Sequence, residues 1–128
     1  MNSVVWFEVP YDNSERAQKF YKDTFGWQIN KVPDMEYFMA LTAESDPQTM
    51  QPKNPGSING GMFKKDSSTS QQPLLVIGVD SIDEHVRKVE SSGGKIIMPK
   101  TDIGQFGFYA RIEDTEGNDV GIWQAPKQ

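Results

Sequence analysis

The chain has 128 residues, no cysteine and a formal net charge of −5. Its length suits a single domain, and the absence of cysteine excludes disulfides, a thiolate nucleophile and thiolate metal ligands. The acidic balance argues against a nucleic-acid partner, because phosphate backbones are bound by clustered lysine and arginine. No run approaches the roughly 20 apolar residues of a membrane helix and no signal peptide is visible, so we expect a cytoplasmic protein without a membrane partner.

The first predicted strand covers residues 5–9. Val5, Phe7 and Val9 alternate there with Trp6 and Glu8, which is the two-residue period of a strand with two different faces. The uniformly apolar face is expected to pack on a helix. The second face carries an indole and a carboxylate, a combination that favours the wall of a cleft over a dry core.

A helix follows, begun by a cap at Asn13 or Ser14 and ended by Gly26. Three strands are predicted after it, over residues 27–31, 35–42 and 58–63. Residues 44–57 contain three prolines and almost nothing apolar, which indicates a surface loop between the last two strands.

The same order of elements returns 68 positions later, so that Asp12 corresponds to Asp80 and Gly26 to Gly94. The second copy comprises a strand over 74–79, a helix begun by a capping box at Ser81, and strands over 95–99, 108–113 and 119–124. Residues 114–118 form the expected hairpin turn between the last two strands. A repeat at a fixed offset dictates the architecture. The predicted fold is therefore α+β: two βαβββ repeats, at residues 3–65 and 73–126 with a linker at 66–72, form a curved mixed sheet around a cleft in one domain spanning 1–128.

Three segments in this order resemble the vicinal oxygen chelate superfamily, which includes glyoxalase I, bleomycin-resistance proteins, methylmalonyl-CoA epimerase and extradiol dioxygenases. They are the stretch from Phe7 to Trp27, the strand Ile58-Asn59-Gly60-Gly61, and Asp114 to Asn118 followed by Gly121-Ile122-Trp123-Gln124. Together they span essentially the whole chain. The chain is most similar to a bacterial glyoxalase-like group in which Gly-Ile-Trp-Gln replaces the usual last acidic ligand.

The resemblance implies four side chains that hold a divalent metal ion in the metal-dependent families. Carried over position by position, these fall at Trp6, Gly61, Leu74 and Gly121. Imidazole nitrogens and carboxylate oxygens are what such ions require, and none of these four residues supplies one. We therefore expect no metal and no other cofactor, and the metal-dependent mechanism of the family does not carry over.

Two residues are candidates for catalysis. Glu8 shares a strand face with Trp6, so its carboxylate is either a general base beside an indole or a strand-end group that reaches solvent or pairs with an arginine. Arg111 either holds an anionic part of a ligand through its two-pronged guanidinium or neutralises Glu8.

Aromatic residues are predicted to line the cleft, the alternative being that they form plain hydrophobic core. Aligning Arg111 with Ala40 in the repeat places Tyr109 and Arg111 on the cleft face together with Phe38. The predicted ligand-binding residues are Trp6, Phe38, Gly61, Phe63, Leu74, Tyr109, Gly121 and Trp123. His85, the single histidine, lies on the second predicted helix and is expected to have no catalytic role. Asp119 is expected to be solvated.

Three functions remain open at this point. The chain holds a small organic molecule without a metal ion, as bleomycin-resistance proteins do; or it is a metal-independent lyase or isomerase with Glu8 as the base; or it is a non-catalytic interaction module whose cleft is filled by its own side chains. The resemblance also implies a homodimer, and the polar linker permits either side-by-side or exchanged units.

Overall fold

The computed structural model describes residues 1–127, which form two compact units. The N-terminal unit is Trp6–Pro73. The C-terminal unit is the chain from Leu74 onward together with Met1–Val5. The boundary falls inside the first strand, β1 (Val4–Tyr11), so the first residues of the chain group with the second repeat.

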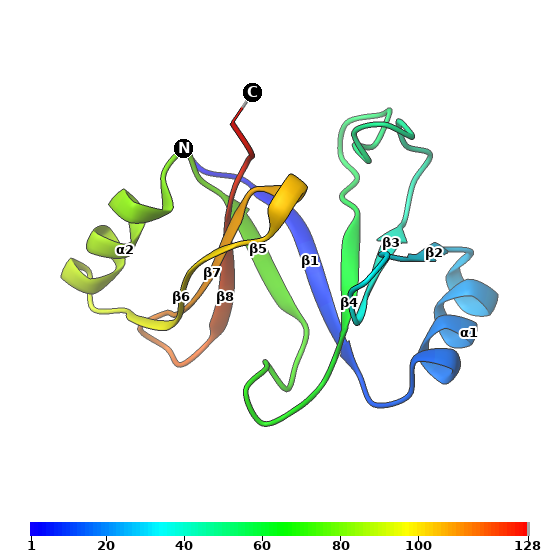
Figure 1. The fold of residues 1–128 in the computed structure, drawn as a ribbon, viewed down its shortest axis with the longest axis horizontal. Coiled ribbons are helices and arrows are strands. Elements are labelled where there is room, and N and C mark those ends of the chain that lie inside the picture. Colours follow the sequence, from blue (N-terminus) through cyan, green and yellow to red (C-terminus); the bar gives the residue numbers. More distant parts are fainter. Residues whose placement is uncertain (128) are drawn as a thin grey trace. The chain divides into compact units, whose positions relative to one another are not determined.

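The N-terminal unit is a four-stranded mixed sheet with one helix, and Figure 1 shows that helix beside the sheet. After β1 it contains α1 (Ser14–Phe25), β2 (Gln28–Lys31), β3 (Tyr37–Leu41) and β4 (Gly60–Lys64). The strands are ordered β2-β3-β4-β1. The β2–β3 and β3–β4 pairs are antiparallel, whereas β4 and β1 run parallel.

Helix α1 begins and ends where the sequence predicts. The Asn13 side chain accepts a hydrogen bond from the backbone N–H of Arg16 at 2.9 Å, which satisfies one of the donors that a helix leaves unpaired at its start. At the other end Gly26 takes a left-handed conformation with φ 72°, which is accessible to glycine without strain.

The core of this unit lies between the sheet and α1. Tyr11, Ile29, Phe38, Ala40 and Met62 are buried there. Partly buried residues of β1, α1 and the following turn pack against them, namely Phe7, Val9, Ala17, Tyr21 and Trp27. The apolar face predicted for β1 is therefore confirmed as the face that packs on the helix.

The C-terminal unit repeats this arrangement with β5 (Leu74–Gly78), α2 (Ile82–Ser91), β6 (Lys95–Asp102), β7 (Phe108–Glu113) and β8 (Asp119–Gln124). A short 3-10 helix, η1 (Gly104–Phe106), precedes β7. The strand order is β5-β8-β7-β6, with β5 and β8 parallel and the other two pairs antiparallel. The prediction of an α+β fold built from two βαβββ units is confirmed.

The predicted start of the helix and the predicted hairpin turn of this unit are also present. The Ser81 hydroxyl accepts a hydrogen bond from the Glu84 N–H at 3.2 Å and caps α2. The turn between β7 and β8 is stabilised by the Asp114 carboxylate, which accepts from the backbone N–H groups of Glu116 and Asn118. Gly117 takes a positive φ of 84° in this turn.

The loop between β3 and β4 is held by one buried amide. Asn59 is 1% exposed, and its oxygen accepts from the backbone N–H of Thr42 at 2.9 Å. Its NH2 group donates to the Ser45 hydroxyl and the Met50 carbonyl, at 2.8 and 2.9 Å.

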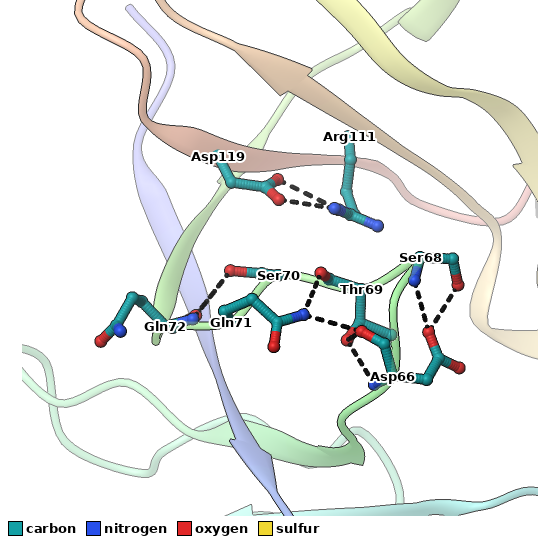
Figure 2. Close-up of polar contacts among 8 residues, drawn as sticks. All are labelled: Asp66, Ser68, Thr69, Ser70, Gln71, Gln72, Arg111 and Asp119. Carbon is teal, nitrogen blue, oxygen red and sulfur yellow. Dashed lines mark hydrogen bonds and ion pairs between the residues drawn. The ribbon is translucent and has the colours of Figure 1, made fainter.

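The linker that follows β4 has contacts of its own: Figure 2 shows the Asp66 carboxylate accepting from the N–H and hydroxyl of Ser68. Within residues 1–127, no helix combines the length and apolar character needed to cross a bilayer.

Candidate functional site

A chain of three polar side chains lies on the face of the N-terminal sheet opposite α1. The Trp6 indole N–H donates to the Tyr37 hydroxyl oxygen at 3.0 Å, and that hydroxyl donates to Glu8 Oε2 at 2.7 Å. Trp6 and Glu8 come together here because they are two residues apart on β1, on the strand face that does not pack on the helix. Glu8 is only 9% exposed, so a buried carboxylate is held in place by a tyrosine hydroxyl.

Gly61 makes room for this arrangement. It lies on β4 between Glu8 of β1 and Met39 of β3. A Cβ atom at this position would be 1.7 Å from the Tyr37 hydroxyl oxygen, so no other residue fits while the tyrosine ring crosses the strand there. We call the surface formed by Trp6, Glu8, Tyr37, Gly61 and Phe63 the Tyr37 face.

The C-terminal unit contains the same pairing of tyrosine and glycine. Gly121 of β8 lies between Val76 of β5 and Arg111 of β7. A Cβ atom on Gly121 would be 2.7 Å from the Tyr109 hydroxyl oxygen. In both units a tyrosine ring therefore occupies the space beside the glycine, at two positions that the sequence predicted to contact a ligand.

Arg111 and Asp119 form an ion pair within the C-terminal unit (Figure 2). Arg111 Nε donates to Asp119 Oδ1 at 3.0 Å, and Nη2 donates to Oδ2 at 2.5 Å. The side chains are 12% and 24% exposed, respectively. The expectation that Asp119 is solvated is wrong, because its carboxylate forms a bidentate ion pair with Arg111. The same guanidinium group was the one expected to bind either an anionic part of a ligand or Glu8.

The remaining predicted ligand-binding residues lie in different surroundings. Phe63 is half-buried on the Tyr37 face, opposite Tyr37 in the register of β3 and β4. The Trp123 indole N–H donates to the Phe106 carbonyl at 2.7 Å and so holds η1 beside β8. Leu74 is 5% exposed on the face of β5 that does not pack on α2.

Phe38 does not lie where the sequence was interpreted to place it. It is buried in the core beside α1, with its ring 5.9 Å from that of Tyr11. The strand register explains the error. Met39 is paired with Gly61 and Arg111 is paired with Gly121, so Arg111 corresponds to Met39 in the repeat and not to Ala40. The aromatic residue of β3 that lies on the face away from α1 is Tyr37, the neighbour of Phe38 in sequence. A shift of one residue moves a strand's side chains to the other face.

The family's metal-ligand positions do not fit a metal ion in this chain. Indole, leucine and two glycines stand there, and at Gly61 the space is taken by the Tyr37 hydroxyl, which is already bonded to Trp6 and Glu8. Among the residues that the structure describes, no group of three or more histidine or acidic side chains is arranged to hold an ion.

Histidine 85 lies on α2, as predicted. Its Nδ1 is 3.0 Å from the Ser81 carbonyl oxygen and its Nε2 is 3.3 Å from Asn2 Oδ1. These contacts link the start of the chain to α2. They belong to the packing of the C-terminal unit.

Tyr37 is the functional candidate that the sequence analysis missed. The repeat contained a signal for it. Tyr37 lies two residues before Met39, and Tyr109 lies two residues before Arg111. Met39 and Arg111 are the residues that pair with Gly61 and Gly121, so the two tyrosines occupy equivalent positions. The hydrogen bonds to Trp6 and Glu8 carried no such signal, because they join strands that are about 30 residues apart.

Comparison with known proteins agrees with the paired βαβββ architecture. Residues 3–42 match the family model described as bleomycin resistance protein-like N-terminal. A putative glyoxylase, CFP32, of Mycobacterium bovis is 33% identical over 126 residues, which cover 94% of this chain and 44% of that protein. The chain thus spans less than half the length of this relative. A glyoxylase-like domain-containing protein of Didymella fabae is 30% identical over 93% of this chain and 91% of its own length.

A solved structure shows the same fold. It is a member of the glyoxalase/bleomycin resistance protein/dioxygenase superfamily from Vibrio splendidus, with a TM-score of 0.61 and 13% identity over 97% of this chain and 99% of that one. Fold and relatives together define a glyoxalase-like protein of two βαβββ units. The chain belongs to the vicinal oxygen chelate superfamily, in its glyoxalase/bleomycin resistance protein/dioxygenase family.

Proposed function

We propose that this glyoxalase-like protein binds a small organic molecule on the Tyr37 face without a divalent ion at the family's ligand positions. The observation that carries the proposal is the Tyr37 hydroxyl, seated on Gly61 and bonded to Trp6 and Glu8. A ring and a buried carboxylate take the space and the polar contacts that a metal ion would need. The surface around them is aromatic and carries one acidic group.

The chemistry of this face favours a planar compound that carries a hydrogen-bond donor. Trp6 and Phe63 are half-buried, so parts of an indole and a phenyl ring remain available for stacking. Glu8 is the acidic group beside them, and a carboxylate is a strong acceptor for a ligand hydroxyl or amine. Small-molecule sites in general combine apolar walls with a few such placed polar groups.

Tryptophan fluorescence tests the proposal. A panel of planar aromatic hydroxyl and amino compounds is titrated into metal-free protein, and quenching is assigned with the Trp6→Phe variant. Tyr37→Phe keeps the ring and removes the hydroxyl that positions Glu8, so we expect it to weaken binding roughly five- to tenfold, the equivalent of about 1 kcal/mol for one hydrogen bond.

Tyr21→Phe is the matched control, because Tyr21 stacks on Trp27 at 4.6 Å on the helix side of the sheet. It is expected to bind like the wild type. Quenching that survives Trp6→Phe unchanged, or an equal loss of affinity in Tyr21→Phe and Tyr37→Phe, would place binding elsewhere and refute the proposal.

A metal-independent lyase or isomerase is the second candidate, favoured by the burial of Glu8 and its bond to a tyrosine hydroxyl. It requires turnover of a compound that binds. In that case Glu8→Gln, which has nearly the same shape, retains the compound and loses the reaction. A protein that binds no member of the panel and turns none over corresponds to the third function, an interaction module.

A further inference from the structure

A hollow of about 390 Å³ lies between the end of β1 and the first half of α1, on the helix side of the N-terminal sheet. Small-molecule sites typically have volumes of about 300 to 1,000 Å³, and a cavity of about 150 Å³ accepts a benzene ring. The hollow therefore has room for one or two fused rings with a short polar substituent. It is separate from the Tyr37 face, which lies on the other side of the same sheet.

The walls of the hollow are largely apolar. Val9 and Pro10 of β1 line it together with Ala17, Phe20 and Tyr21 of α1. Ala17 has a short side chain at the place where the helix packs on the sheet, so space remains between the helix and the end of β1.

Phe20 gives this wall an accessible aromatic ring. The residue is 54% exposed, although its ring contacts that of Tyr21 edge to face at 5.2 Å. Tyr21 in turn stacks on Trp27 at 4.6 Å, which ties the ring cluster to the unit. A flat ring bound in the hollow would meet an aromatic partner that is already in position.

The unbalanced charge at the hollow is positive. Arg16 lines it and lies four residues before Phe20, so the two side chains are neighbours along the helix. Within residues 1–127 the Arg16 guanidinium has no ion-pair partner. Asp12 also lines the hollow, but its carboxylate is 3.3 Å from Lys65 Nζ, which balances its charge.

We propose that this hollow is a second ligand site, which takes a small aromatic carboxylate. The ring of the ligand lies against Phe20 and the apolar wall, and its carboxylate accepts from the guanidinium of Arg16, whose planar fork matches a carboxylate. The charge preference is opposite to that of the Tyr37 face, where the acidic group is Glu8. The two sites are therefore expected to select different ligands.

NMR titration of the full chain with 2-naphthoate tests the proposal. We expect changes in the backbone amide signals of residues 9–21 and a dissociation constant of about 1 mM or lower, as suits a small ligand on an open site. Cyclohexanecarboxylate, which has the charge but no aromatic ring, is expected to bind several-fold more weakly.

Two variants separate the contributions of charge and ring. Arg16→Gln is expected to weaken 2-naphthoate binding roughly tenfold. Its matched control is Lys22→Gln, which removes one positive charge from the same helix outside the hollow and should bind like the wild type. Phe20→Leu keeps an apolar side chain without the flat ring, so it should weaken 2-naphthoate about threefold and leave cyclohexanecarboxylate unchanged. Arg16 and Phe20 are both exposed, so these variants should keep the fold, which a thermal melt verifies.

Tyr37→Phe separates this proposal from that of the Tyr37 face, since it should leave 2-naphthoate binding unchanged. The proposal is overturned if no amide signal changes up to about 10 mM 2-naphthoate, at which a site of the expected affinity is about nine-tenths filled. Signal changes centred on Tyr37 and Gly61, or equal affinities of Arg16→Gln and Lys22→Gln, would also overturn it.

Discussion

Tyr11, the last residue of β1, shows how one side chain ties the end of a strand to both the core and the surface. It is 4% exposed, and its hydroxyl donates to Glu36 Oε1 at 2.9 Å. Burial, the hydrogen bond to Glu36 and the charge of that carboxylate together raise the pKa of Tyr11 to about 12. All three causes disfavour the tyrosinate, so the folded protein holds the phenolic proton more tightly than the unfolded chain does.

This difference predicts a loss of stability at alkaline pH. The folded pKa lies above the unfolded value of 10, so the contribution of Tyr11 is complete below pH 10 and disappears as the pH rises to about 12. Over that interval the free energy of unfolding of the wild type should fall by about 2 to 3 kcal/mol relative to Tyr11→Phe, which has no phenolic proton to lose.

Urea unfolding of both proteins at pH 8, 10, 11 and 12 measures the difference, since other alkaline titrations contribute equally to each. Tyr21→Phe serves as a second tyrosine-to-phenylalanine variant. Parallel pH profiles for the wild type and Tyr11→Phe would show that the proton on Tyr11 is not held in this way.

Among the elements, the sequence predicted the helices and strands well because their signals are local. Caps, a glycine stop and two-residue alternation are each contained within a few neighbouring residues, and all of them were recovered in α1, α2 and β1. The face of β3 was not predicted correctly. Phe38 and Tyr37 are adjacent and both aromatic, so composition does not distinguish them. Only the pairing of Met39 with Gly61 decides which one faces away from the helix.

The contact between β3 and β4 at Gly61 gives a prediction for the strands themselves. In Gly61→Ala the new methyl group would lie 1.7 Å from the Tyr37 hydroxyl oxygen and 2.1 Å from the ring carbon that bears it. The ring must move away and its bonds to Trp6 and Glu8 are lost, which leaves a buried carboxylate without that donor. We expect a loss of about 2 to 4 kcal/mol in the free energy of unfolding.

A double-mutant cycle with Tyr37→Ala separates this effect from a general cost of alanine in β4. Once the ring is absent, the alanine has space, so the double variant should be more stable than the sum of the single losses predicts by at least about 1 kcal/mol. Strict additivity of the two losses would mean that Tyr37 and Gly61 do not interact.

For the whole molecule, the 68-residue repeat predicted the architecture, and the resemblance predicted the family. Both follow from the order of elements, which survives large changes in individual side chains. The partners of Arg111 and Glu8 could not be derived in this way. Arg111 is paired with Asp119 across a hairpin, and Glu8 with Tyr37 across strands that are distant in sequence. Such pairs depend on register and on which rotamers the packing permits.

The replaced ligand positions also predict how the molecule responds to metal ions. An ion that binds the folded state alone at 100 times its dissociation constant adds about 2.7 kcal/mol, which raises the melting temperature of a chain of this size by several degrees. Trp6, Leu74, Gly61 and Gly121 offer no imidazole nitrogen or carboxylate oxygen as a metal ligand, and the Tyr37 hydroxyl takes the space at Gly61. Calorimetry of protein freed of metal with EDTA should therefore show a change below about 1 °C on adding Zn²⁺, Ni²⁺, Mn²⁺ or Mg²⁺. A rise of several degrees that saturates at one ion per chain would mean that this chain has built a metal site from other side chains. The proposal of metal-independent binding on the Tyr37 face would then have to be abandoned.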